Sequence, residues 1–312
     1  MLKDRNHRCF LSAMPRYGGL GDAFSPGGGL NIFVSDGRTA TADFFNSWIS
    51  GNGGGIAATD GALVVISRGY GENCHILPEC SLIAHNRAGD TGAAAYAREA
   101  QVAVFQGVIR NNAALAEAGA DVFASTGGNI QIQDSLITRG PGSNGLPSAP
   151  DGPNNYTFWI ANNASLILWG ATAADSHPAE RVFRFGGSAS VLDLTHAIVH
   201  EQSNIAMFRF NGSPTTHTKC VLWHSDALTN LDGNQMFHMV ADPMFVDRDN
   251  MNFQLQPDSP AVDFCDGLVG RSHDLLHRPR GIQTKDSMLH GPYDLGAFEF
   301  QGDALFSDRF EL

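Results

Sequence analysis

The chain has 312 residues and a net charge of −12, with 35 glycines, 20 phenylalanines and only 17% charged residues. The negative charge argues against nucleic acid or an anionic membrane surface as the main partner. Many glycines joined by short apolar segments, without long amphipathic patterns, favour an elongated all-β chain over a helical one.

Residues 1–26 show no regular pattern, and they contain no apolar run long enough for a signal peptide. No stretch of about 18 apolar residues occurs anywhere, so we expect no transmembrane segment. Among the five cysteines, Cys74 and Cys80 are the only pair near enough in sequence to suggest a bridge, and two unpaired loop thiols fit equally well. No cysteine spacing resembles a zinc site.

A repeat of about 25 residues extends over residues 27–247. The segments FWIANNASLIL, FRFGGSASVLD and FRFNGSPTTHT begin at Phe158, Phe183 and Phe208, each 25 residues after the one before, and a looser copy begins at Phe237. Each segment has an alternating stretch, a Gly or Asn pair that can supply positive φ, and a second alternating stretch. About eight such units, stacked so that equivalent strands pair, would bury one continuous core. The sequence therefore predicts a parallel β-helix, with loops over residues 73–90 and 139–155.

The pattern changes over residues 248–300, which precede a short tail, 301–312. Pro243, Pro257 and Pro260 cannot continue a central strand, so we expect this segment to be irregular and to cap the coils. Asp242, Asp263 and Asp294 are then most simply turn and backbone-capping residues, and metal binding is the less favoured alternative.

This segment resembles the closing segment of bacterial β-helix proteins of the pectin-lyase-like superfamily, the choice-of-anchor Q type. The matching residues are Asp242, Pro243, Phe245, Leu255, Pro257, Ser259, Pro260, Ala261, Asp263, Arg278, Pro279, Asp294, Gly296, Ala297 and Glu299. The resemblance implies a right-handed helix and an extracellular or cell-surface protein, but no particular reaction. Because such proteins usually begin with a signal peptide and an N-terminal cap, we expect this chain to lack its natural start.

Residues one repeat apart in the sequence are expected to be neighbours in space, stacked about 4.8 Å apart on successive coils. The phenylalanines of the triplets are expected to point into the core, and Trp159, Arg184 and Arg209 to point out, with His238 next in line. An indole that stacks on a sugar and arginines that grip carboxylates would suit an acidic glycan. The alternative is that these are ordinary solvent-facing strand residues.

A second set of residues also recurs at steps of 24 or 25, at another corner: Asp175, His177, His200, Glu201, His224 and Asp226. Imidazoles and carboxylates at coil spacing could act as a general acid and base or bind a cation, and solvated turn residues are the simpler interpretation. Lys219 or Arg209 could serve as the base of a polysaccharide lyase, although no acidic column accompanies them.

Two functional hypotheses follow. The first is a non-catalytic exported or surface β-helix protein, a scaffold, adhesin or acidic-glycan binder, with no cofactor. The second is a polysaccharide lyase or glycoside hydrolase acting on an acidic polysaccharide along one face, for which calcium would be the expected cofactor. We expect a monomer in either case.

Overall fold

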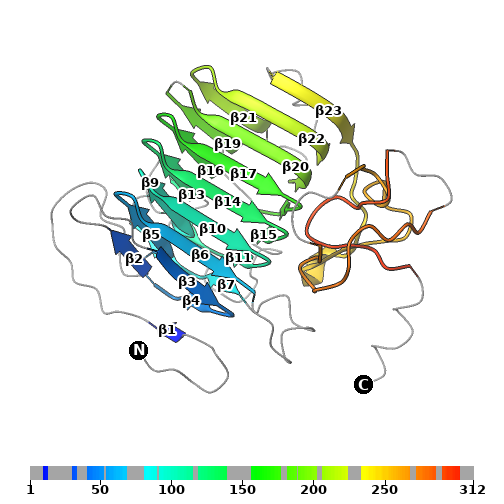
Figure 1. The fold of residues 1–312 in the computed structure, drawn as a ribbon, viewed down its shortest axis with the longest axis horizontal. Helices are drawn as coiled ribbons and strands as arrows, with labels where there is room; N and C mark the ends of the chain where they lie inside the picture. Colours follow the sequence, from blue (N-terminus) through cyan, green and yellow to red (C-terminus); the bar gives the residue numbers. More distant parts are fainter. Residues whose placement is uncertain are drawn as a thin grey trace.

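The chain forms a parallel β-helix, shown in Figure 1 as rows of strands stacked from the blue end of the chain to the yellow one. The computed structural model describes residues 10–12, 30–33, 41–52, 54–68, 81–89, 91–114, 119–138, 156–176, 181–187, 189–201, 206–223, 233–267, 272–285 and 290–302. Within these ranges there is no helix with the length and hydrophobicity that a membrane crossing requires.

A fourteen-stranded parallel sheet, the long sheet, supplies two faces of the coils. Its first row is β3 (Thr41–Phe45), β6 (Leu63–Ser67), β10 (Gln101–Phe105), β14 (Asn129–Gln133) and β17 (Ser165–Trp169). Its second row is β1 (Phe10–Ser12), β4 (Trp48–Ser50), β7 (Leu82–Ala84), β11 (Val108–Arg110), β15 (Leu136–Thr138) and β18 (Thr172–Ala174). Three long strands continue through both rows: β20 (Val191–His200), β22 (Thr215–Trp223) and β23 (Gly233–Val240).

A seven-stranded parallel sheet, the second sheet, supplies the third face. It contains β2 (Leu30–Phe33), β5 (Ile56–Thr59), β9 (Ala95–Arg98), β13 (Ala120–Ser125), β16 (Tyr156–Ala161), β19 (Arg181–Gly186) and β21 (Ala206–Asn211). A short pair, β8 (Arg87–Ala88) and β12 (Ala113–Ala114), lies beside the rows. Every strand of the long and second sheets pairs with its equivalent one coil away, which is the arrangement that the repeat predicts.

The core contains a stack of phenylalanines contributed by the second sheet. Phe183 pairs in register with Phe158 on one side and Phe208 on the other, at ring separations of 5.0 Å and 5.3 Å. Phe158 and Phe183 are fully buried, and Phe208 is partly buried. This confirms the predicted direction of the phenylalanines in the triplets.

The turn pairs between the second sheet and the long sheet also behave as predicted. Asn162 has φ 53°, Gly187 has φ 86° and Gly212 has φ 151°. A side chain on Gly212 would overlap the carbonyl oxygen of Gly187 in the coil below, so only glycine fits there. The loop predicted over 73–90 is wrong in its second half, because Leu82–Ala84 is the strand β7. Residues 139–155 lie outside the described residues.

The two rows of the long sheet meet at a corner where seven described residues, each from a different coil, have a left-handed conformation. These residues, which we call the corner column, are Asn46, Gln106, Asp134, Gly170, His196, Cys220 and Phe237, with φ between 47° and 58°. Such a residue turns the chain sharply between two short strands and directs the side chain away from the core. Six of them contact residues 261–300: Gln106, Asp134, Gly170, His196, Cys220 and Phe237.

The C-terminal segment contacts this corner along the side of the stack. Gln106 donates hydrogen bonds to the carbonyl oxygens of His273 and Asp274, at 3.0 Å and 2.8 Å. Further along the corner, the backbone nitrogen of Gly296 donates to the carbonyl oxygen of His196 at 2.8 Å. Figure 1 shows this segment, in orange and red, beside the strands.

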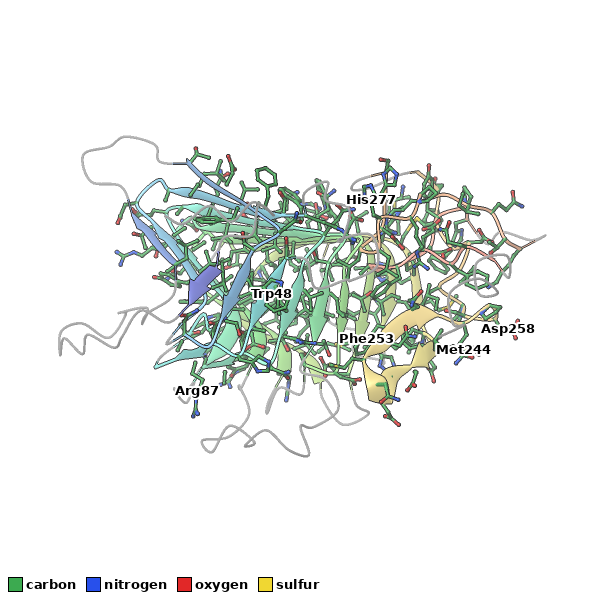
Figure 2. All side chains as sticks on the ribbon, turned by 90° about the horizontal axis from the view of Figure 1, so that it is seen from below. Trp48, Arg87, Met244, Phe253, Asp258 and His277 are labelled. Atoms are coloured by element: carbon green, nitrogen blue, oxygen red, sulfur yellow. A yellow bond between two sulfur atoms is a disulfide. The ribbon has the colours of Figure 1, made fainter. Side chains whose placement is uncertain are left out.

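A hairpin precedes this segment and packs on the second row of the long sheet. It is formed by β24 (Phe245–Asp247), the 3-10 helix η3 (Arg248–Asn250) and β25 (Asn252–Leu255). Phe253, labelled in Figure 2, is buried in a cluster that includes Leu136 and Ile198.

Asp242, Asp263 and Asp294 are capping residues, as predicted, and Asp242 accepts a hydrogen bond from the backbone nitrogen of Met244 at 2.9 Å. Asp263 accepts hydrogen bonds from the backbone nitrogens of Thr284 and Lys285, at 2.9 Å and 2.6 Å. Asp294 accepts from the backbone nitrogens of Asp263 and Phe300. Carboxylates substitute here for the strand partners that irregular backbone lacks.

Candidate functional site

An outward column on the second sheet joins three aromatic rings to two guanidinium groups. Tyr96, Phe123, Trp159, Arg184 and Arg209 pair in register across β9, β13, β16, β19 and β21. The ring centroids are 5.5 Å apart from Tyr96 to Phe123 and 4.6 Å apart from Phe123 to Trp159. The structure therefore brings together the predicted Trp159, Arg184 and Arg209, and adds two rings to them.

Trp159 lies between its two column neighbours. Phe123 contacts it from β13, and the guanidinium carbon of Arg184 lies 4.0 Å from its ring centroid, from β19 on the other side. Both ring faces are therefore in contact with protein, so the indole supports Arg184 instead of offering a face to a sugar ring. Gly186 makes room for this arrangement, because a Cβ there would lie 3.0 Å from the indole nitrogen.

The two arginines are held by Tyr156 as well. The Nη1 of Arg209 donates a hydrogen bond to the Tyr156 hydroxyl at 2.7 Å, and the guanidinium of Arg184 lies 5.0 Å from the Tyr156 ring centroid. Tyr156 is almost completely buried, whereas Arg209 is exposed and Arg184 is half-buried. The result is a pair of neighbouring positive charges with fixed positions.

His238 does not belong to this column, so its predicted position is wrong. It lies in β23 of the long sheet, paired with Val221, and its Nε2 lies 3.3 Å from the carbonyl oxygen of Thr218. Burial lowers the pKa of His238, and the hydrogen bond to Thr218 partly opposes this. The resemblance of Phe237 to the triplets is misleading because that residue is the left-handed one at the corner, φ 54°, and not a core residue of the second sheet.

The second predicted set is only partly described, and its described members are structural. Asp175 accepts a hydrogen bond from Arg248 Nε at 2.6 Å, and Glu201 accepts one from the backbone nitrogen of Ser176 at 3.0 Å. His200 is buried, with its ring edge-on to Phe245 at 5.9 Å. These groups fasten one coil to the next and to the hairpin, so they do not form an open acid–base site. His177, His224 and Asp226 lie outside the described residues.

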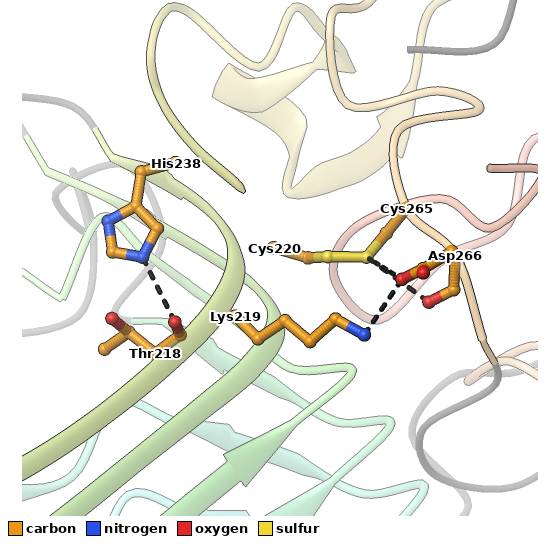
Figure 3. Close-up of a disulfide and its surroundings, with 6 residues drawn as sticks. All are labelled: Thr218, Lys219, Cys220, His238, Cys265 and Asp266. Atoms are coloured by element: carbon orange, nitrogen blue, oxygen red, sulfur yellow. Dashed lines mark hydrogen bonds and ion pairs between the residues drawn. A yellow bond between two sulfur atoms is a disulfide. The ribbon is translucent and has the colours of Figure 1, made fainter. Parts of the chain in front are cut away.

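Lys219, the other candidate base, lies on the long sheet and so on a different face from the two arginines. Its ammonium forms an ion pair with Asp266 at 2.8 Å, as Figure 3 shows, and this hydrogen bond lowers the pKa of Asp266. Lys219 and Arg209 therefore do not act at one site.

The adjacent Cys220 forms a disulfide with Cys265, across a Cα–Cα distance of 5.9 Å. The prediction that only Cys74 and Cys80 could pair is wrong, because Cys220 and Cys265 are 45 residues apart in sequence and meet through the docking of the C-terminal segment. Cys74 and Cys80 themselves lie outside the described residues.

Three neighbours of these sites escaped the sequence analysis: Tyr156, Phe123 and His196. Tyr156 opens the strand that holds Trp159, so its position was available from the repeat. Phe123 does not stand out in the sequence, because it lies 36 residues before Trp159, whereas the repeat is about 25 residues long. His196 lies 24 residues before Cys220, a normal coil step, but the two residue types share no pattern that would single them out.

Comparison of the chain with protein-family models, with curated proteins and with solved structures finds no match.

Proposed function

We propose that this chain is a non-catalytic β-helix protein that binds an acidic polysaccharide through Arg184 and Arg209. The observation that carries the proposal is the register pairing of the two arginines, each fixed by an aromatic neighbour. In keeping with the resemblance of its C-terminal segment, we place it among exported or cell-surface proteins with the right-handed, pectin-lyase-like fold.

The chemistry of the arginine pair favours an anion as the ligand. Ring contacts hold the face of the Arg184 guanidinium; its Nε is buried without a hydrogen-bond partner among the described residues, so the Nη groups are the ones that can donate to a carboxylate. Among the described residues, the contacts of Arg184 are with rings alone. Like charges opposite one another on neighbouring strands are unfavourable, and a bound carboxylate relieves that cost.

A repeating polymer fits better than a single small anion. The two guanidiniums belong to consecutive coils, so their backbones are about 4.8 Å apart, and carboxylates on successive uronate residues could engage one arginine each. The chain as a whole carries a charge of −12, which repels a polyanion everywhere except at a local positive site. Binding is therefore expected to be confined to this column and to weaken with salt.

The test is binding of the full chain to polygalacturonate, measured by isothermal titration calorimetry at low and at physiological salt. We expect Arg184→Gln and Arg209→Gln each to weaken binding by roughly ten- to a hundredfold, because a charge-assisted hydrogen bond contributes roughly 1.5–3 kcal/mol. Arg98→Gln is the matched control, since Arg98 is an exposed arginine of the same sheet outside the column.

Equal losses in all three variants would reduce the effect to net charge and refute the site. Arg209→Lys tests whether binding depends on the charge alone or on the planar guanidinium, because lysine keeps the charge but cannot bind a carboxylate through two parallel N–H groups. Release of unsaturated products during the titration, followed by absorbance with and without calcium, would show that the protein is a lyase and would overturn the non-catalytic assignment.

A further inference from the structure

Three buried side chains with metal-ligating atoms meet where the C-terminal segment crosses the corner column. His196 and Cys220 are consecutive members of that column, on the paired strands β20 and β22. Cys265 arrives from the segment, held by two backbone hydrogen bonds to Tyr293 at 3.0 Å and 3.1 Å. A ring nitrogen of His196 and the two Sγ atoms all lie within 4.8 Å of one another.

The imidazole of His196 is buried beside the two sulfurs, and one of its ring nitrogens has no hydrogen-bond partner among the described residues. The side chain is 2% exposed, its ring hydrogen-bonds to the backbone of Asp266, and Nε2 has no hydrogen-bond partner among the described residues. A buried polar nitrogen without a partner is unusual and calls for an explanation. In metal sites, a backbone carbonyl commonly fixes one imidazole nitrogen so that the other can bind the ion.

We propose that Cys220, Cys265 and His196 form a zinc site when the disulfide between the two cysteines is reduced. Two thiolates and an imidazole are a ligand set that Zn²⁺ favours. The Asp266 carboxylate lies nearby, with its Oδ1 3.8 Å from the Sγ of Cys265. Figure 3 shows this carboxylate beside the disulfide, where it also meets Lys219.

The disulfide and the metal exclude each other, because the sulfur atoms must be thiolates to bind zinc. A phosphine and one water molecule reduce the disulfide to two thiols and give the phosphine oxide. Zn²⁺ then replaces the two thiol protons, which are released. Hydrogen peroxide and two protons reverse the change: the sulfurs rejoin, Zn²⁺ leaves and two water molecules form.

Both states connect the same two parts of the molecule. The disulfide joins the corner at Cys220 to the segment at Cys265, and zinc bound by the same sulfurs would join them again. The site would therefore keep the C-terminal segment attached to the coils under reducing conditions, where the disulfide alone would be lost.

The test uses Co²⁺, whose visible spectrum reports thiolate ligands, with the full chain carrying Cys9→Ser, Cys74→Ser and Cys80→Ser. These changes remove every thiol outside the proposed site. After phosphine reduction we expect one equivalent of Co²⁺ to bind, with thiolate-to-cobalt charge-transfer bands that Zn²⁺ abolishes. We expect no bands before reduction.

His196→Ala decides whether the third ligand is real, because it leaves both cysteines and the disulfide intact. We expect it to weaken Co²⁺ binding by tenfold or more, whereas His238→Ala, a histidine one strand away in β23, should leave binding unchanged. Unchanged affinity in His196→Ala would overturn the proposal, as would the absence of charge-transfer bands in the reduced chain. A reduced chain that unfolds and does not refold on addition of Zn²⁺ would overturn it as well.

Discussion

Replacing Arg280 with methionine should detach the C-terminal segment from the coils. Arg280 is 2% exposed and lies 2.8 Å from Asp134 of the corner column and 3.5 Å from Glu299 of the segment. It also donates a hydrogen bond to the carbonyl oxygen of Gly296 at 2.8 Å. Burial lowers the pKa of Arg280, but Asp134 and Glu299 outweigh it and raise that pKa above its ordinary value.

The expected loss in the free energy of unfolding comes from the buried carboxylates that Arg280→Met leaves unpaired. Methionine fills much of the volume but leaves buried carboxylates without their cation, and breaking a buried ion pair in this way costs roughly 3–5 kcal/mol. That is a large part of the roughly 5–15 kcal/mol that stabilises a typical domain. Because the lost contacts hold the segment to the corner, hydrogen exchange should quicken first in residues 272–285 and 290–302.

Urea denaturation gives the free energy of unfolding, and a double-mutant cycle with Asp134→Leu isolates the pair. We expect the double variant to be clearly more stable than the sum of the single changes predicts, because it removes both charges. Arg280→Lys, which keeps the charge without the fork, should cost less than methionine. A loss below about 1 kcal/mol for Arg280→Met, or strict additivity in the cycle, would refute this account of the docking.

Three further changes test the coils and the buried carboxylates. Phe183→Ala should lower the free energy of unfolding by roughly 3–5 kcal/mol in urea, since it empties the middle of the phenylalanine stack, and a loss below about 1 kcal/mol would contradict that packing. Gly212→Ala should lower the melting temperature by several degrees, because its Cβ would overlap Gly187; an unchanged melting temperature would show that the turn can move aside. Burial raises the pKa of Glu299 from 4.5 to about 7, so the folded chain binds more protons than the unfolded chain between these values. The free energy of unfolding should therefore fall as pH rises from about 4.5 to about 7, and Glu299→Gln should flatten that slope; a wild-type profile already flat would contradict the raised pKa.

Local sequence patterns predicted the coils well because the coil is a local structure. Phe158, Phe183 and Phe208 recur at a fixed interval since each occupies the same place in successive turns, and stacking gives them the same buried environment. Asn162 and Gly187 were recognisable at the turns because few other residues adopt positive φ easily. The outward direction of Trp159 and Arg184 then followed from alternation.

Contacts made across the corner were not predictable in the same way. The pairing of Cys220 with Cys265 depends on where an irregular segment docks, and no periodicity describes such a segment. The left-handed corner residues are not recognisable from the sequence either, because Gln106, Asp134, His196 and Cys220 share a conformation but no side-chain chemistry. The prediction that His238 follows Arg209 in the outward column was wrong for a related reason. Its strand, β23, runs through the corner of the long sheet, so the Phe-His-Met triplet lies on a different face from the Phe-Arg-Phe triplets.

The attachment of the C-terminal segment to successive members of the corner column has a consequence for the evolution of the chain. Solenoids commonly lengthen or shorten by whole repeats, since each repeat contacts only its neighbours. Here one segment contacts Gln106, Asp134, His196 and Cys220 together, and an inserted coil would displace those contacts from one another by about 4.8 Å. The segment therefore fixes the number of coils between its contacts at Gln106 and at Cys220. Coils can be gained or lost without disturbing these contacts only outside that interval.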